Sequence, residues 1–172
     1  MVSSHVFFYT LTIEKFEHLL ADDNLKLVIL KSLQYLVKAG LVEIYSYVIM
    51  PNHIHLLWTI LGSNGKESPA GSFAKYTAHR FRNYLVNHHP DILLQYASEK
   101  RDRNHQFWKR DALAVPITHK EIFIQKLEYI HNNPINEKWN LCTLPEDYRW
   151  SSAQFYLSGH DEFGILKHFR DI

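Results

Sequence analysis

The stretch Val48–Thr59, VIMPNHIHLLWT, decides how this chain folds. Apolar residues with strong strand preference lie on both sides of Pro51-Asn52, a pair typical of a tight turn. Two strands joined so closely are expected to pair antiparallel, one over 42–50 and the other over 53–60. The stretch therefore predicts a hairpin inside a larger sheet.

The second strand of this hairpin carries the pair His53 and His55. Alternate side chains of a strand point to the same face, so both imidazoles project together while Ile54 points the other way. Neutral imidazole is a common metal ligand, and a pair on a rigid strand needs one or two further donors to hold a divalent ion. The ordinary alternative is two histidines on the polar face of a strand.

Working outward, the hydrophobic periodicity predicts alternating strands and helices. A capping box at Thr118 and Glu121 is expected to open the last long helix, which Pro134 ends. Glycine, serine, asparagine and proline mark residues 61–72 as a loop, with Ser72 as the cap of the helix that follows. The other expected elements are strands at 5–13 and 112–117 and helices at 24–39 and 72–88.

The last helix carries a second polar group, in the segment KLEYIHNNP. Tyr129 and Asn133 are four residues apart and therefore share one face, at the edge of the arc expected to be buried. A tyrosine there has an exposed hydroxyl, although most tyrosines in such positions only cover the core with their ring. Periodicity alone does not decide between these two interpretations.

Composition indicates one globular domain with a sizeable core. The chain has 172 residues, 46% of them hydrophobic and 22% charged. A single cysteine, Cys142, excludes an internal disulfide framework, and neither a basic leader nor a membrane-length apolar run is present. We therefore expect a cytoplasmic protein.

The formal net charge of +1 neither indicates nor excludes a nucleic-acid partner, so any basic patch must be local. Cations alternate with Phe107-Trp108, a mixture that suits single-stranded nucleic acid, although a charged loop before a short strand is equally ordinary. A second stripe of cations lies on the helix expected at 72–88. A solvated helix face and a phosphate-contacting surface are equally good interpretations of that stripe. The candidate DNA-contacting cations are Lys75, Arg82, Lys100, Arg101, Arg103, Lys109 and Arg110.

If the two polar groups meet in the folded chain, they can perform phosphoryl transfer. A divalent ion held by His53, His55 and the carboxamide of Asn133 would polarise a phosphodiester oxygen. Tyr129 would then stand beside the phosphorus as nucleophile, with a cation nearby to activate its hydroxyl. Such ligands fit Mg²⁺ or Mn²⁺, and attack would give a covalent phosphotyrosine and a free hydroxyl end.

Four segments together resemble the single-tyrosine HUH transposases, in their REP-associated tyrosine transposase branch. They are MPNHIHLLW, YIHNNP, the FW of QFWKRD, and DYRWSSA. The resemblance covers nearly the whole chain to about Tyr156, with one departure: INEKWNL, after the NP pair, lacks the expected small residues and glycine. It implies that His53, His55 and Asn133 bind the metal and that Tyr129 is the nucleophile.

The resemblance also implies a fold and a substrate. The fold would be an α+β ferredoxin-like domain with a central antiparallel sheet and helices on one face. We expect the catalytic domain at 1–145 and a C-terminal tail, 146–172, packed on it. The activity would be cleavage and rejoining of bacterial single-stranded DNA at hairpin-forming palindromes, by a monomer or a homodimer.

Two other functions are alternatives to this one. Histidine-triad nucleotide hydrolases also carry His-hydrophobic-His on a strand, but their third histidine would fall at Leu57. A domesticated relative could instead bind hairpin DNA or RNA without cleaving it. The complete set of His53, His55, Tyr129 and Asn133 favours an active enzyme over such a binding module.

Overall fold

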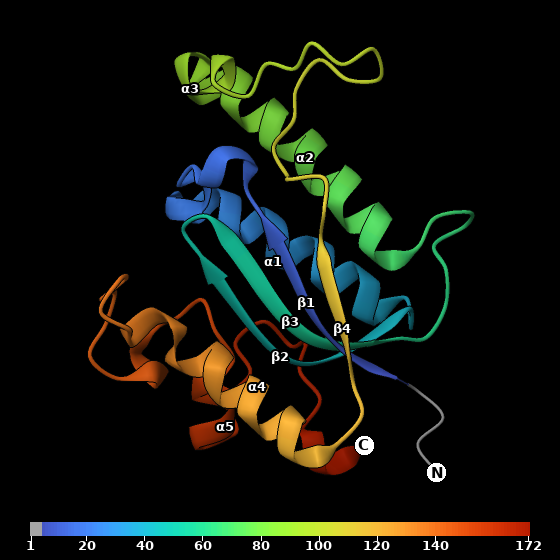
Figure 1. Ribbon diagram of the computed structural model, residues 1–172, viewed down its shortest axis with the longest axis vertical. Coiled ribbons are helices and arrows are strands. Elements are labelled where there is room, and N and C mark those ends of the chain that lie inside the picture. The colour runs from blue at the N-terminus through green and yellow to red at the C-terminus, as the bar shows by residue number, and fades with distance from the viewer. Residues whose placement is uncertain (1–4) are drawn as a thin grey trace.

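The centre of the molecule is a four-stranded antiparallel sheet with the strand order β2-β3-β1-β4 (Figure 1). The computed structural model describes residues 5–172; residues 1–4, which form part of the stretch searched for a leader, lie outside this range. The strands are β1 (Val6–Thr12), β2 (Val42–Met50), β3 (His53–Ile60) and β4 (Leu113–Ile117). The predicted α+β class and the central antiparallel sheet are confirmed.

The β2–β3 hairpin forms where the sequence predicts it. Met50 pairs with His53 across the turn, and β3 pairs antiparallel with β1 on its other side. In this register Thr12 lies opposite His53, and Thr10 lies opposite His55. The histidine pair therefore lies on β3, one of the two inner strands of the sheet, with the other inner strand, β1, beside it.

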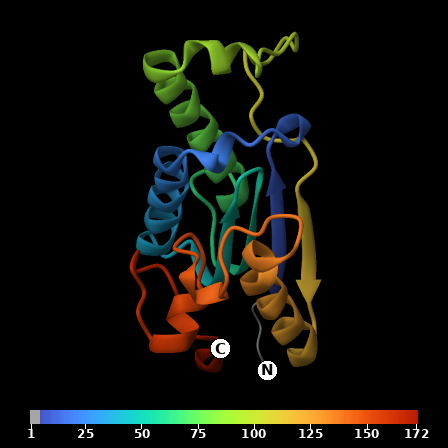
Figure 2. The ribbon, with the colours of Figure 1, turned by 90° about the vertical axis from the view of Figure 1, so that its left-hand side faces the viewer.

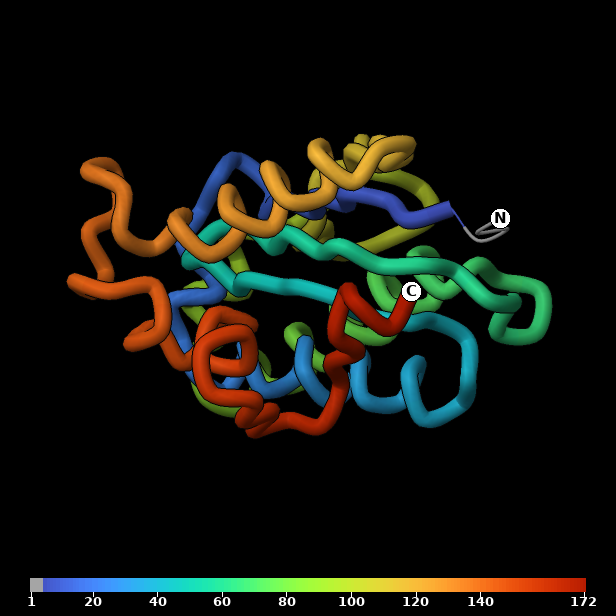
Figure 3. Tube along the Cα trace, turned by 90° about the horizontal axis from the view of Figure 1, so that it is seen from below, coloured from blue at the N-terminus to red at the C-terminus, as the bar shows by residue number. Residues whose placement is uncertain are grey.

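The helices lie on both faces of the sheet (Figures 2 and 3). Helices α1 (Asp23–Lys38) and α2 (Pro69–His88) are the crossovers that join β1 to β2 and β3 to β4, and they share one face as expected. Helix α4 (Lys120–Asn132) lies on the opposite face, which differs from the expected one-sided arrangement. The reason is that α1 and α2 already cover their face, so the apolar side of α4 packs on the free one.

The two faces of β3 have different surroundings. Ile54 and Leu56 point away from α4, because the alternate residue His55 lies against Tyr129 of α4, and both are almost fully buried. On the other side Phe123 of α4 packs edge-on against Tyr45, with ring centroids 5.9 Å apart. The face under α4 is the one toward which the histidine pair points.

Two helix starts differ from the prediction. Helix α2 begins at Pro69, three residues before the expected start at 72, because the Ser68 hydroxyl accepts the Gly71 N–H at 3.1 Å. Helix α4 has no capping box: the Thr118 hydroxyl instead lies 2.8 Å from Nδ1 of His119, the residue at the cap. The short helices α3 (Pro90–Leu94) and α5 (Ala153–Ser158) were not anticipated.

Residues 146–172 run along the outer edge of β2. Trp150 C=O accepts the Ile49 N–H at 2.8 Å, and Lys167 N–H donates to Ile44 C=O at 2.9 Å. The Tyr148 hydroxyl donates to the Ile49 carbonyl at 2.7 Å. These bonds cover a strand edge that would otherwise be open to pairing with other chains.

Across residues 5–172, no helix combines the length and apolar character that crossing a membrane requires.

Candidate active site

His53 and His55 lie side by side under α4, with ring centroids 4.6 Å apart. His55 is buried, with 5% of its surface exposed, and His53 is half-buried at the start of β3. The strand alternation that the sequence predicts therefore brings the two rings to one place on one face.

Each ring is held by its Nδ1 atom. The Nδ1 of His53 lies 2.6 Å from Oδ1 of Asn52, and the Nδ1 of His55 lies 2.7 Å from the hydroxyl of Thr10. A carboxamide oxygen only accepts, so the Nδ1 of His53 donates, and its Nε2 keeps a free lone pair. The Thr10 hydroxyl can accept from His55 in the same way. Metal-binding histidines are commonly held by such hydrogen bonds at the other nitrogen.

Three buried side-chain polar atoms have no hydrogen-bond partner among residues 5–172: Nδ1 of His105, in the loop after α3, and, beneath α4, Nε2 of His55 and Oδ1 of Asn133. A buried atom left unpaired costs on the order of 1–3 kcal/mol, so native proteins seldom keep one without a role. The two atoms beneath α4 are strong metal-ligand types, an imidazole nitrogen and a carboxamide oxygen. Their lone pairs are therefore suited to binding a metal ion.

The imidazoles are neutral at neutral pH. Burial, together with the charge of Lys138, lowers the pKa of His53 to about 4. Burial, with smaller effects from His53 and Lys126, lowers the pKa of His55 to about 3. The neutral ring is the form that can bind a metal ion.

Tyr129 stands next to this pair in the same chain. Its ring centroid is 5.3 Å from that of His55 and 6.0 Å from that of Phe8, and 51% of the residue is exposed. The amino group of Lys126, one turn earlier on α4, is 5.6 Å from the Tyr129 ring centroid. A phenol at the rim of the pair, with a cation beside it, can reach a substrate from solvent.

Asn133 follows Tyr129 by one helical turn. Its backbone angles (φ −55°, ψ −46°) continue the direction of α4, and the residue is 4% exposed. Helix α4 runs parallel to β1 and antiparallel to β3, because Tyr45 meets Phe123 and His55 meets Tyr129. Four helical residues advance about 6 Å, close to the two-residue step of a strand. Asn133 is thereby carried toward the level of His53.

A third side-chain ligand would have to be of another type than His, Cys, Asp or Glu. No cluster of three such residues suited to a metal exists in the part of the chain that the structure describes. The unpaired oxygen of Asn133 is a donor that meets this requirement. His53, His55 and Asn133 could together hold a divalent ion.

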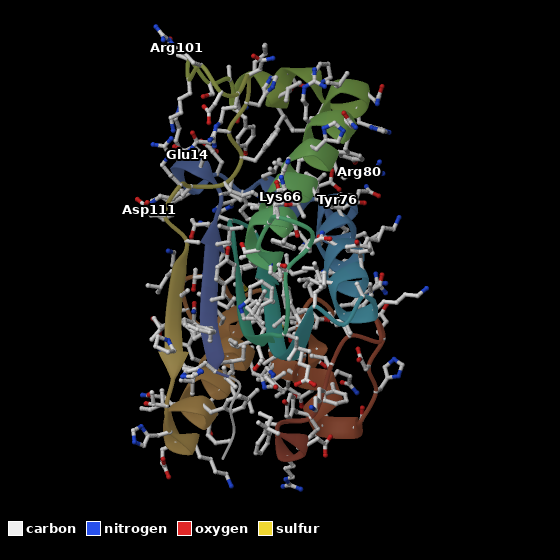
Figure 4. All side chains as sticks on the ribbon, turned by 90° about the vertical axis from the view of Figure 1, so that its right-hand side faces the viewer. Glu14, Lys66, Tyr76, Arg80, Arg101 and Asp111 are labelled. Carbon is white, nitrogen blue, oxygen red and sulfur yellow. The ribbon has the colours of Figure 1, made fainter. Side chains whose placement is uncertain are left out.

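The predicted DNA-contacting cations are spread over a larger surface. Lys75 forms an ion pair with Glu67 (2.7 Å) near the start of α2, and the Lys100 amino group donates to Gln106 at 2.6 Å. Arg103 pairs with the neighbouring Asp102. Arg101 is at the far end of the loop after α3, well away from the sheet (Figure 4). Arg82 is exposed on α2, on the α1 side of the sheet.

Lys109 and Arg110 are the exception, because their segment runs beside the histidine end of the sheet. The Lys109 N–H donates to the carbonyl of Thr12 at 2.7 Å, and Thr12 pairs with His53. The aromatic rings of this segment are not available to bases: Phe107 and Trp108 are 2% and 7% exposed. Trp108 donates its indole N–H to Thr77 at 2.9 Å, so these rings join α2 to the core.

Four neighbours of the site were not singled out from the sequence. Asn52 follows Pro51 in the turn, so the sequence indicates only a turn residue and not its hydrogen bond to Nδ1 of His53. Thr10 needs the β1–β3 register to be found. Lys126 could have been found, because it precedes Tyr129 by three helical residues. Trp139, whose ring centroid is 6.0 Å from that of His53, gives no sequence signal of its position.

Comparison with known proteins identifies the fold. No family model and no curated protein matches the sequence. The solved structure of a REP-associated tyrosine transposase bound to a REP hairpin superposes with a TM-score of 0.60 at 17% identity, over 92% of this chain and 83% of that one. A candidate transposase of Deinococcus radiodurans matches at a TM-score of 0.41 and 16% identity, over 77% of this chain and 92% of that one. This chain has the fold of a REP-associated tyrosine transposase.

Proposed function

We propose that this protein is a transposase that cuts and rejoins single-stranded DNA through a covalent bond to Tyr129. The observation that carries the proposal is the pair of unpaired buried ligand atoms, Nε2 of His55 and Oδ1 of Asn133, beside an exposed tyrosine of the same chain. Most buried polar atoms of a stable core are paired, and here an unpaired nitrogen lies beside a second imidazole. The fold shared with a transposase is consistent with this role.

His53, His55 and Asn133 would hold Mg²⁺ or Mn²⁺. When bound, the ion would act as a Lewis acid on a phosphodiester oxygen and position the phosphorus. Asn52 and Thr10 orient the two imidazoles so that their Nε2 lone pairs face the site. Burial keeps both rings neutral, so protons do not compete for those lone pairs at neutral pH.

Tyr129 is the nucleophile in this proposal. Its hydroxyl oxygen forms a bond to phosphorus as the phenol proton passes to solvent water, and the bond from phosphorus to the oxygen of one strand end breaks. That departing oxygen takes up a proton and becomes a hydroxyl end. The reverse attack by a hydroxyl end restores the phosphodiester and frees the tyrosine. Lys126 places a positive charge where the phosphate would carry negative charge.

The proposed substrate is single-stranded DNA beside a hairpin. The similar transposase is described as bound to a REP hairpin, which makes a hairpin the first substrate to test. Lys109 and Arg110 lie at the histidine end of the sheet and are the cations best placed for the strand near the site. Because Tyr129 and His55 come from one chain, a monomer carries the complete set, and a homodimer is compatible with it.

The decisive experiment is a search for a protein–DNA adduct that survives denaturation. Wild-type protein, hairpin DNA with single-stranded flanks and Mn²⁺ should give a slower band on a denaturing gel, and chelator should remove it. Tyr129→Phe should abolish the adduct while keeping hairpin binding. Tyr76→Phe is the matched control, since Tyr76 is similarly exposed (45%) but lies on α2, away from the site (Figure 4). Hairpin binding without any adduct would instead indicate a binding module.

A further inference from the structure

Trp139 differs from the other tryptophans of the chain. Trp58, Trp108 and Trp150 are 7% exposed or less, whereas Trp139 is only half-buried. Its ring centroid lies 6.0 Å from the His53 ring and 5.4 Å from the His18 ring. An indole at the rim of the candidate site therefore keeps part of its surface open to solvent.

The local backbone fixes this indole in place. The Trp139 N–H donates to the carbonyl of Asn136 at 3.1 Å and to the Asn136 side-chain oxygen at 3.2 Å. Asn140 then adopts a left-handed backbone conformation with φ +44°. Glycine adopts this conformation most easily, but the segment 135–141 contains none. A ring presented on a closed turn loses little freedom when a ligand packs on it.

The charge around Trp139 is positive. The amino group of Lys138 lies 5.4 Å from the Trp139 ring centroid, and it forms no ion pair with any residue in the range 5–172. The same lysine is close enough to His53 to lower its pKa. A half-exposed aromatic ring beside an unneutralised cation is a combination that binds single-stranded nucleic acid, since bases stack on the ring and a phosphate contacts the charge.

We propose that Trp139 stacks on an unpaired nucleobase next to the phosphodiester that Tyr129 attacks, while Lys138 contacts a neighbouring phosphate. This inference rests on the proposed function and adds a base-binding subsite to it. Stacking accepts any base, because every base has a π-face, so the subsite selects strandedness rather than sequence. A duplex base is already stacked on its neighbours and would gain little from the indole. The subsite would thus direct cleavage to single-stranded flanks.

The test combines protein and DNA changes in one cycle. All proteins carry Tyr129→Phe, so that binding is measured without cleavage. Trp139→Ala should weaken binding to a hairpin with single-stranded flanks by about 5- to 150-fold, and Trp139→Phe should restore most of the loss. Tyr76→Ala, which removes an aromatic ring of α2, should leave binding unchanged. Binding is followed by fluorescence anisotropy of labelled DNA.

The DNA partner of Trp139 is found by abasic scanning. One abasic nucleotide, next to the cleaved bond, should weaken binding to the Trp139-containing protein by a similar factor and should cause no further loss with Trp139→Ala. Equal and additive losses at every position, or no loss with Trp139→Ala, would overturn the proposal. If Trp139→Ala fails to fold, 2-aminopurine at each flanking position replaces it: quenching at one position upon binding is expected, and quenching at none contradicts the stacking.

Failure of the stacking and failure of the proposed function give different results. If hairpin DNA forms a Tyr129 adduct but the cycle is additive, the transposase proposal stands and the base subsite is wrong. If no adduct forms, the same scan over all single-stranded positions still measures whether Trp139 stacks on a base. Lys138→Ala should reduce the salt dependence of binding without changing which position is sensitive.

Discussion

His55 and His131 are two enclosed histidines that differ in what their Nε2 atoms contact. Burial lowers the pKa of both, to about 3 for His55 and about 4 for His131. The Nε2 of His131, on α4, lies 2.8 Å from the Ser152 hydroxyl and 3.4 Å from that of Ser46, so this ring joins α4 to the tail and β2. The Nε2 of His55 has no such partner within residues 5–172. The two residues share burial and a lowered pKa, and they differ in that the unpaired Nε2 belongs to His55, whose ring lies 4.6 Å from a second imidazole, that of His53.

The largest predicted difference between the two histidines is in adduct formation. His55→Ala should slow formation of the covalent protein–DNA adduct by about 1,000-fold, because loss of a metal ligand removes several kcal/mol of charge stabilisation. His131→Ala should change the rate less than about threefold in protein that remains folded, which circular dichroism checks. Equal losses in both variants would mean that His55, like His131, acts only through the fold.

Stability should fall as the pH is lowered. The folded pKa values of His53, His55 and His131 lie below the unfolded value of about 6.5, so the unfolded state binds more protons below that pH. The contribution is complete above about pH 6.5 and is lost toward pH 4, at about 1.4 kcal/mol per pH unit for each ring. Urea unfolding at pH 7, 6 and 5 measures the slope.

The pH profile of His131→Gln sharpens the comparison. This variant lacks one titrating ring and should show a shallower slope than the wild type, by up to about 1.4 kcal/mol per pH unit. The double substitution of His53 and His55 by Asn should remove about twice as much. An unchanged slope in both variants would show that these rings do not stay neutral in the folded protein.

Mn²⁺ should stabilise the folded protein by binding the pair His53 and His55, and His131 should have no part in this stabilisation. At a Mn²⁺ concentration 100 times its Kd, the free energy of unfolding should rise by about 2.7 kcal/mol. His131→Ala should keep the full increase, because the Nε2 of His131 is engaged with the hydroxyls of Ser46 and Ser152 and does not bind the metal in this proposal. The joint replacement of His53 and His55 by Ala should abolish it. Chemical unfolding with Mn²⁺ or with chelator measures the increase in each protein.

The smallest predicted effect concerns the neighbours that orient the rings. Thr10→Val removes the hydroxyl bonded to Nδ1 of His55 with little change of volume, and should weaken Mn²⁺ binding about 10- to 100-fold. Ser152→Ala makes the corresponding change at His131 and should leave Mn²⁺ affinity unaltered. Isothermal titration of the metal compares the two. A larger loss in Ser152→Ala would reverse the assignment of the two histidines.

Local sequence patterns predicted the β2–β3 hairpin and the face shared by His53 and His55. Strand alternation and turn chemistry depend on neighbours in sequence, so β2 and β3 have the expected bounds. The exposure of Tyr129 and the burial of Phe123 and Ile130 also follow from helical periodicity.

Features that depend on tertiary contacts were not predictable in this way. The sequence indicates that Phe107 is near cations, but α2 packs over this ring and removes it from solvent. The position of α4 on the second face depends on which face α1 and α2 cover. The start of α2 differs because Ser68 competes with Ser72 as the cap and the following Pro69 favours the earlier start. The position of Trp139 beside His53 depends on tertiary packing, which the local sequence pattern does not indicate.

The most direct measurement of the central claim is the anomalous diffraction of Mn²⁺ soaked into crystals of this protein. We predict one strong peak at about 2.0–2.3 Å from Nε2 of His53, Nε2 of His55 and Oδ1 of Asn133, on the side that faces Tyr129. The same soak with the His53 and His55 double variant should show no peak there. A saturating soak that leaves these three atoms without a peak, or a peak bound by other residues only, would contradict the account.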